Sequence, residues 1–212
     1  MVNLAAFASG RGSNFIAVLE YLERKSLPAR YTVLISDRPH PPAADIALDR
    51  GVAFVHLNPK GFDSPEEYAA RLVRELESYK VEWITLAGYL KLIPSEVVQR
   101  YRGRILNIHP ALLPMFGGSG MYGERVLQAV IESGVKISGA TVHIVDEEFD
   151  RGPIILQESV PVYFEDTPET VAHRVLEVEH RLYPRAVELA VTGRLIVHGR
   201  RVEILDPAIE KP

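Results

Sequence analysis

The sequence predicts an α/β fold, with a doubly wound and mostly parallel sheet to which antiparallel strands are added in the C-terminal half. Apolar runs of strand length alternate with stretches of helical spacing through the first hundred residues. Those runs are not broken by alternating polar residues, which is typical of parallel strands covered on both faces. Two longer β-rich runs then follow one another closely, as antiparallel neighbours do.

The first half supplies the parallel part of the predicted sheet. Its expected strands are Val2–Ala8, Tyr31–Ile35, Ala53–Leu57, Trp83–Leu86 and Arg104–Ile108. Its expected helices are Asn14–Lys25, Pro42–Arg50, Pro65–Tyr79 and Pro94–Tyr101. Each helix stands between two strands, so right-handed crossovers place the helices on the faces of the sheet.

The second half departs from this alternation. A glycine-rich stretch, "FGGSGMYG", precedes an expected helix at Glu124–Ser133. The runs Ile137–Val145 and Ile154–Val162 are the expected antiparallel strands, and "RLIVHGRRVEIL" near the end reads as a small hairpin. The residues after that hairpin give no clear structural signal.

A long helix is expected between the second β-rich run and the hairpin. Asp166 or Thr167 caps it, Pro168 occupies its first turn and Gly193 ends it. Pro184 lies inside the pattern, where it lacks an N–H and its ring crowds the preceding turn, so we expect a kink or a break there.

Composition limits the classes of function. The 212 residues suit a single domain, 1–212, and the absence of cysteine excludes disulfides, thiolate metal sites and cysteine nucleophiles. The N-terminus lacks the pattern of a signal peptide, and no apolar stretch reaches the roughly 18 residues of a membrane span. A net charge of −4 gives no general attraction to nucleic acid. We therefore expect a cytoplasmic protein that binds neither nucleic acid nor a membrane.

The stretch "FASGRGSNF" follows a strand and opens a helix. A glycine-bearing turn at a helix N-terminus directs backbone N–H groups at an anion, and phosphate is its natural ligand. The alternative is a plain turn in which Ser13 or Asn14 caps the helix. Phe15 stands where a dinucleotide-binding loop has its third glycine, which counts against a nicotinamide cofactor.

The stretch "ILNIHPALLP" places Asn107 and His109 on one face of an otherwise apolar strand. Open α/β sheets bind ligands at the carboxyl ends of their strands, where these residues fall. Histidine exchanges protons near neutral pH, and an asparagine amide can donate to a developing oxyanion. The pair suits acyl transfer without a covalent intermediate. The alternative is that Asn107 caps a turn and His109 is a satisfied core histidine.

In "TVHIVDEEFDRGPI" a strand runs into four acidic residues and a Gly-Pro turn. Asp146, Glu147 and Glu148 suit a solvated loop, whereas the turn after Asp150 can aim its carboxylate. A carboxylate directed at a histidine raises the histidine pKa and holds the ring in place. His143, on the preceding strand, is interpreted as a structural residue.

Other catalytic sites find little support. The remaining histidines show no metal-ligand spacing, so no metal is expected. Ser119 lies in "GGSGM" without a strand before it, so a serine hydrolase is not indicated.

With these motifs in place, the chain resembles the glycinamide ribonucleotide formyltransferases, a folate-dependent family of purine synthesis. The resemblance rests on "SGRGSN", "LAGYLKLI", "LNIHPALLP", "TVHIVDEEFDRGPI" and "EHRLYP", in that order over nearly the whole chain. It implies formyl transfer from 10-formyltetrahydrofolate, as co-substrate, to the amine of glycinamide ribonucleotide. It further implies a phosphate-binding half, 1–100, and a folate-binding and catalytic half, 101–212.

The same resemblance assigns residues to roles. Asn107, His109 and Asp150 match the catalytic trio. The expected contacts to the phosphate and ribose of the acceptor are Gly12, Ser13, Asn14, Leu176, Glu177, Val178 and Glu179. The expected contacts to folate are Leu90, Lys91, Leu92, Ile93, Asn107, Asp146, Glu147, Glu148, Phe149 and Asp150. On this hypothesis both polar side chains of the strand are buried because they face the formyl group.

Two departures from the family pattern concern the substrates. The loop "MFGGSGMYG" is longer and richer in glycine than the common aromatic-Pro-Gly form, which leaves its contact with the acceptor open. Pro65 stands where the family often has an arginine associated with folate, and Arg71 is a candidate to replace it.

Three alternative functions fit the sequence less well. A formyltransferase for initiator tRNA would need a positively charged domain, which this chain lacks. A hydrolase of formyl-folate usually carries a regulatory domain ahead of the first strand, which here begins at residue 2. A non-catalytic nucleotide-binding module has no use for the trio. A homodimer is left open by the sequence.

Overall fold

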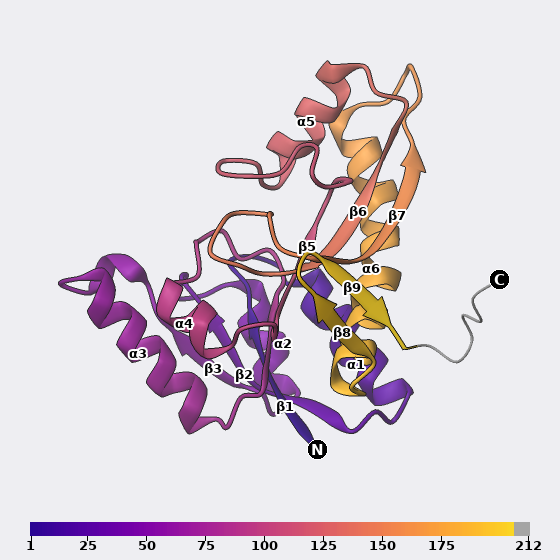
Figure 1. Ribbon diagram of the computed structural model, residues 1–212. Coiled ribbons are helices and arrows are strands. Elements are labelled where there is room, and N and C mark those ends of the chain that lie inside the picture. Colours follow the sequence, from indigo (N-terminus) through magenta and orange to yellow (C-terminus); the bar gives the residue numbers. More distant parts are fainter. Residues whose placement is uncertain (206–212) are drawn as a thin grey trace. The chain divides into compact units, whose positions relative to one another are not determined.

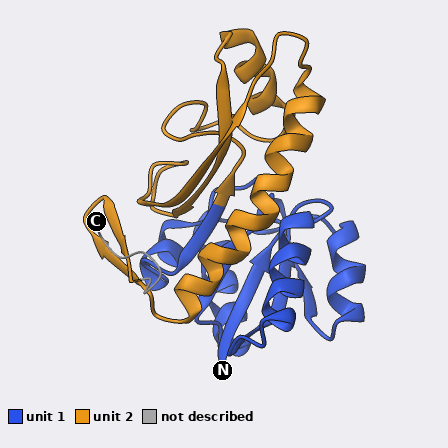
Figure 2. Cartoon of the chain, turned by 90° about the vertical axis from the view of Figure 1, so that its right-hand side faces the viewer, with its two compact units in different colours: residues 1–107 blue, residues 108–212 orange. Residues whose placement is uncertain are grey.

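The structure, a computed structural model, describes residues 1–205 and consists of two compact units, Met1–Asn107 and Ile108–Pro212 (Figure 2). The boundary between the two units falls within β5 (Ile105–His109). Residues 206–212, which belong to the C-terminal tail without a clear sequence signal, lie outside the described residues. We describe each unit by itself.

The first unit is built on parallel strands (Figure 1). They are β1 (Val2–Phe7), β2 (Ala29–Ser36), β3 (Ala53–His56), β4 (Trp83–Leu86) and the first residues of β5. Their order is β3-β2-β1-β4-β5, which reverses direction at β1. This is the doubly wound arrangement, in which ligands bind where the order reverses.

Helices follow the strands of this unit in chain order. They are α1 (Ser13–Arg24), α2 (Pro42–Asp49), the short 3₁₀ helix η1 (Pro59–Gly61), α3 (Pro65–Ser78) and α4 (Ser95–Arg100). The four α-helices each bury apolar residues; for example, the ring of Phe15 on α1 meets that of Tyr31 on β2 edge-on, with centroids 4.9 Å apart. Ser64 caps α3 by accepting from the N–H of Glu67.

The second unit is mixed. β6 (Ile137–Ile144) and β7 (Ile154–Pro161) pair antiparallel, and β8 (Leu195–His198) pairs antiparallel with β9 (Arg201–Ile204). β9 meets β7 in parallel, so the strand order here is β6-β7-β9-β8. Two helices, α5 (Glu124–Ser133) and α6 (Pro168–Val191), pack beside these strands (Figure 1).

The long helix α6 begins as predicted but is not interrupted. The hydroxyl of Thr167 accepts from the N–H of Thr170, and that side chain accepts from the N–H of Thr167 in return, while Gly193 follows the end with φ 68°. Of the two outcomes expected at Pro184, the break is wrong, because α6 runs through it, and the kink stays a prediction. Pro184 and its neighbour Tyr183 are buried, so packing holds the helix together where one hydrogen bond is missing.

The predicted fold class is confirmed, and the predicted strands and helices recur with bounds that shift by one or two residues. Among residues 1–205, no helix is both long enough and apolar enough to cross a membrane.

Candidate active site

His109, at the end of β5, lies beside Asp150 in the second unit. Its side chain is only 4% exposed, and its Nδ1 is 3.5 Å from Asp150 Oδ2. Side chains alternate between the two faces of a strand, so His109 on β5 points to the face opposite that of Ile108. The structure therefore brings together two of the three residues that the resemblance assigned to catalysis.

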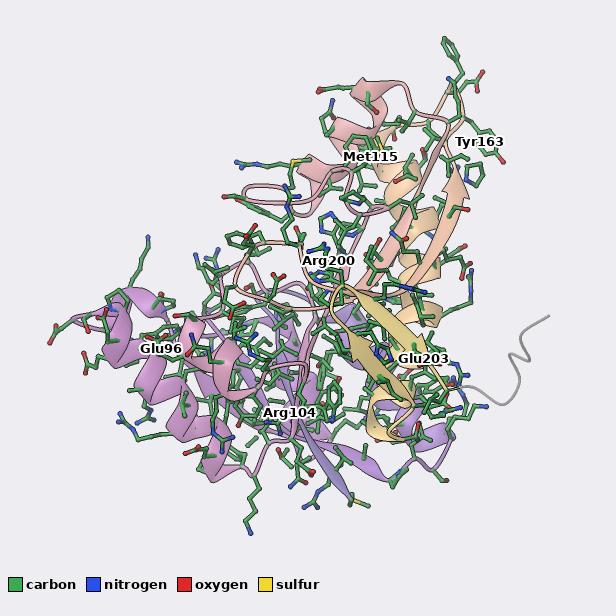
Figure 3. All side chains as sticks on the ribbon, viewed as in Figure 1. Glu96, Arg104, Met115, Tyr163, Arg200 and Glu203 are labelled. Atoms are coloured by element: carbon green, nitrogen blue, oxygen red, sulfur yellow. The ribbon has the colours of Figure 1, made fainter. Side chains whose placement is uncertain are left out.

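The segment after β6 fixes Asp150. Its backbone has φ 54°, a left-handed conformation that an aspartate adopts at a cost and that often marks a functional site. Gly152 packs directly on the carbonyl of Ile144, where a Cβ would lie only 1.7 Å from that oxygen. Arg200, in the turn between β8 and β9 (Figure 3), donates to the carbonyl of Arg151 at 2.7 Å. These contacts support the predicted aiming of the carboxylate by the Gly-Pro turn.

His143, on β6, approaches Asp150 from the other side. Its Nε2 is 3.5 Å from Asp150 Oδ1, its Nδ1 is 3.0 Å from the carbonyl oxygen of Ile144, and its side chain is 2% exposed. The sequence interpretation treated His143 as structural and missed this contact. The sequence did contain a signal for His143. Thr141 and His143 are two residues apart on β6, as Asn107 and His109 are on β5, and such a spacing puts both polar side chains on one face of a strand.

The electrostatics correct one expectation. Burial lowers the pKa of His109 more than the Asp150 carboxylate raises it, so the net direction is downward. The ring of His109 is therefore neutral near pH 7, whereas the sequence argument expected Asp150 to keep it charged. The pKa of Asp150 is also lowered, because hydrogen bonds from His143 and Gly118 and the charge of His109 outweigh the effect of burial.

The glycine-rich loop 115–123 contacts both members of the pair. It begins at Met115 (Figure 3), and the carbonyl of Phe116 lies 2.8 Å from His109 Nε2. Because a carbonyl only accepts, Nε2 carries a proton. The N–H of Gly118 donates to Asp150 Oδ2 at 3.0 Å. The loop thus fixes the tautomer of His109 and gives Asp150 a backbone donor.

Asn107 shares β5 with His109 but is only partly buried. The expectation that both polar side chains are buried therefore holds for His109 alone. Part of the Asn107 side chain is therefore accessible to solvent.

The proposed phosphate turn opens α1. Gly12 occupies the N-cap position with φ 67°, and no side chain caps the helix, so the suggestion that Ser13 or Asn14 does so is wrong. A Cβ on Gly12 would lie 2.7 Å from Cβ of Ala43. Only glycine fits this turn, and the N-terminus of α1, which no side chain caps, favours an anion.

The other predicted substrate segments are partly exposed. In the segment 90–93, Leu90 donates its N–H to Ser9 Oγ at 3.1 Å and Lys91 Nζ lies 3.8 Å from Asp37, while Leu90 and Leu92 are exposed and Ile93 is buried. Within the segment 146–150, Phe149 is exposed and Asp146 accepts from the N–H of Glu148.

Two further predicted contacts lie on helices. On α6, the segment 176–179 ends in Glu179, which is 7% exposed. On α3, Arg71 pairs with Glu75, one turn along the same helix. Within the described part of the chain, no group of His, Cys, Asp or Glu is placed to hold a metal ion.

Comparison with known proteins places these residues in a family. The formyl transferase family matches residues 2–187. A phosphoribosylglycinamide formyltransferase of Bacillus subtilis is 36% identical over 89% of this chain and 94% of its own. A chloroplastic one of Vigna unguiculata is 44% identical over 91% of this chain, which spans only 62% of that relative.

Among solved structures, a glycinamide ribonucleotide transformylase from Symbiobacterium toebii superposes with a TM-score of 0.91. It is 41% identical, and the match covers 97% of this chain and 95% of that one.

Proposed function

This chain belongs to the formyl transferase family, and from that premise we propose that it transfers the formyl group of 10-formyltetrahydrofolate to the amine of glycinamide ribonucleotide. The acceptor follows the names of its relatives from Bacillus subtilis and Symbiobacterium toebii. The observation that carries the proposal is the contact of buried His109, at the end of β5, with partly buried Asp150, in which Nδ1 and Oδ2 lie 3.5 Å apart.

In the proposed reaction, the neutral amine of the acceptor attacks the formyl carbon directly. Holding both substrates in place supplies a large part of the rate. Asn107 and His109 donate hydrogen bonds to the oxyanion of the tetrahedral intermediate, and each such donor is typically worth on the order of 3 kcal/mol. Loss of the folate nitrogen then completes the transfer.

His109 changes its charge during this reaction. Its lowered pKa keeps it neutral in the free protein. An oxyanion beside the ring would raise that pKa, because an opposite charge favours the imidazolium. The attacking amine becomes a cationic ammonium in the intermediate, so His109 can take its excess proton and pass it to the departing folate nitrogen, while Asp150 keeps the ring oriented. His109 therefore becomes a proton donor only when the tetrahedral intermediate has formed.

The remaining residues would bind the two substrates. Gly12, Ser13 and Asn14 would hold the phosphate of the acceptor, and the segment 176–179 would contact its ribose through Glu179. The segments 90–93 and 146–150 would bind the pterin of the folate, mainly through backbone groups. The homodimer and the cytoplasmic location stay predictions.

Mixing the purified protein with 10-formyltetrahydrofolate, with and without glycinamide ribonucleotide, tests the proposal. Loss of the formyl donor should require the acceptor, and the His109→Ala variant should abolish it. Loss without acceptor would instead identify a hydrolase of formyl-folate. Absence of loss in both mixtures would contradict formyl transfer to this acceptor.

A further inference from the structure

The hydroxyl of Thr141, on β6, is a junction of three hydrogen bonds. It donates to the carbonyl of Ala111 at 2.6 Å and accepts from the N–H of Leu113 at 3.0 Å. It also accepts from Nε2 of Gln157, the residue directly opposite on β7, at 3.0 Å. A hydroxyl offers one donor and two acceptor sites, so the capacity of this group is fully used. Thr141 is buried, and its hydroxyl therefore depends on these partners.

Gln157 completes the anchoring of Leu113. Its amide nitrogen donates to the carbonyl of Leu113 at 2.9 Å as well as to the hydroxyl of Thr141. Because a carbonyl only accepts, the nitrogen of the amide and not its oxygen must face Leu113. The N–H and the C=O of Leu113 are thus both held by side chains of the β6–β7 pair. Neither bond belongs to the ladder between the strands, so the sheet does not need them in order to form.

Leu113 in turn fixes the start of the loop 115–123. Its side chain is buried and packs so closely on Gly117 that a Cβ added there would overlap it. The same Cβ would lie 3.1 Å from Cβ of Asp150. The carbonyl just before Gly117 is the one that contacts His109, and the N–H just after it is the one that donates to Asp150. The position of Leu113 therefore determines where both of these backbone groups lie.

We propose that Thr141 and Gln157 are positioning residues, which hold the loop 115–123 against His109 and Asp150. The inference rests on the proposed function, in which neither residue touches the reacting atoms. Four of the nine loop residues are glycine, so the loop loses much conformational entropy on becoming ordered and needs an anchor outside itself. Catalytic groups keep their geometry only while such supporting hydrogen bonds lock them in place.

Substitutions at Gln157 separate this role from packing. Gln157 is exposed, so its replacement leaves the core intact. Gln157→Met keeps the length of the side chain and removes both donors, whereas Gln157→Glu keeps the shape and turns a carboxylate toward the carbonyl of Leu113. The anchoring role predicts that the loop is held best in the parent protein, less well in Gln157→Met and least in Gln157→Glu. Packing alone would place the isosteric Gln157→Glu level with the parent protein.

Amide hydrogen exchange of the full chain, without substrate, measures how well the loop is held. Loss of one neutral hydrogen bond corresponds to about a fivefold change in an equilibrium constant, so the N–H of Gly118 should exchange about fivefold faster in Gln157→Met and faster still in Gln157→Glu. Thr141→Val also leaves the N–H of Leu113 without its acceptor and should have a larger effect, whereas Thr141→Ser keeps the hydroxyl and should resemble the parent protein. Unchanged exchange at Gly118 in both Gln157→Glu and Thr141→Val would overturn the proposal.

Steady-state kinetics test the consequence for the proposed reaction. The value of kcat should fall about fivefold in Gln157→Met and further in Gln157→Glu, with KM changed by less than about twofold. Gln128→Met is the matched control, because the amide of Gln128 on α5 donates to Glu132 at 2.7 Å, and its loss should alter neither kcat nor exchange at Gly118. Faster exchange with an unchanged kcat would refute the positioning role. Absence of turnover in the parent protein would instead contradict formyl transfer, and the exchange result would still decide whether the loop is anchored.

Discussion

Gly152 offers a sharp test of how the site is held. An ideal Cβ on Gly152 would lie 1.7 Å from the carbonyl oxygen of Ile144 and 2.8 Å from its carbon. Both atoms are backbone and cannot rotate away, so in the Gly152→Ala variant one segment must move by roughly 1.5 Å to restore van der Waals contact. Asp150 is only two residues from the altered position, so its carboxylate moves with that segment.

The expected effect follows from that displacement. Misplacement of a catalytic group by about 1 Å can cost 10²-fold in rate, so kcat should fall by about two orders of magnitude. Overpacking of this kind also costs about 1–3 kcal/mol in the free energy of unfolding. Steady-state kinetics with both substrates and urea unfolding of the same preparation measure the two quantities.

Gly61→Ala is the control substitution. Gly61 lies in η1, and a Cβ there would meet no atom within 4 Å. Its kcat and unfolding free energy should match those of the parent protein. A Gly152→Ala variant with kcat within about twofold of the parent would refute the claim that this close approach positions Asp150.

Three further predictions concern charge and capping. Asp150→Asn keeps the shape of the side chain but can place an N–H₂ against the donors from His143 and Gly118, so kcat should fall at least about 100-fold with KM less affected in steady-state assays. The folded-state pKa of His109 lies below its unfolded value of 6.5, so the folded state binds fewer protons and stability falls as pH drops through and below 6.5. Urea unfolding at pH 7 and pH 5 should therefore show a smaller loss of unfolding free energy for His109→Gln than for the parent protein. An equal loss in the two proteins would contradict the lowered pKa. Thr167→Ala removes the cap of α6 and should cost about 1 kcal/mol in urea unfolding, whereas no change would show that the cap contributes nothing.

Local patterns predicted most of the fold. Apolar runs and cap residues have short-range causes, so the bounds of α3 and α5 could be expected from the chain alone. Pro184 was misjudged because the sequence shows the missing hydrogen bond and not the packing that compensates for it. Intrinsic preference gives way to tertiary contacts at such a position.

The site was predictable where its residues share one strand or one turn. Asn107 and His109 follow from strand alternation, and Asp150 follows from the turn after it. The contact between His143 and Asp150 depends on how the segment 145–153 folds back on Ile144, which no spacing in the sequence reveals. The neutral state of His109 likewise depends on burial, which only the folded structure supplies.

In the proposed reaction the formyl group passes directly from folate to the acceptor amine. The most direct measurement supplies 10-formyltetrahydrofolate with a ¹³C-labelled formyl carbon, together with unlabelled formate and glycinamide ribonucleotide, and follows the products by NMR and mass spectrometry. Direct transfer predicts one labelled N-formyl product for each tetrahydrofolate formed, and no label in formate. Label released into formate, or no labelled product, would contradict it.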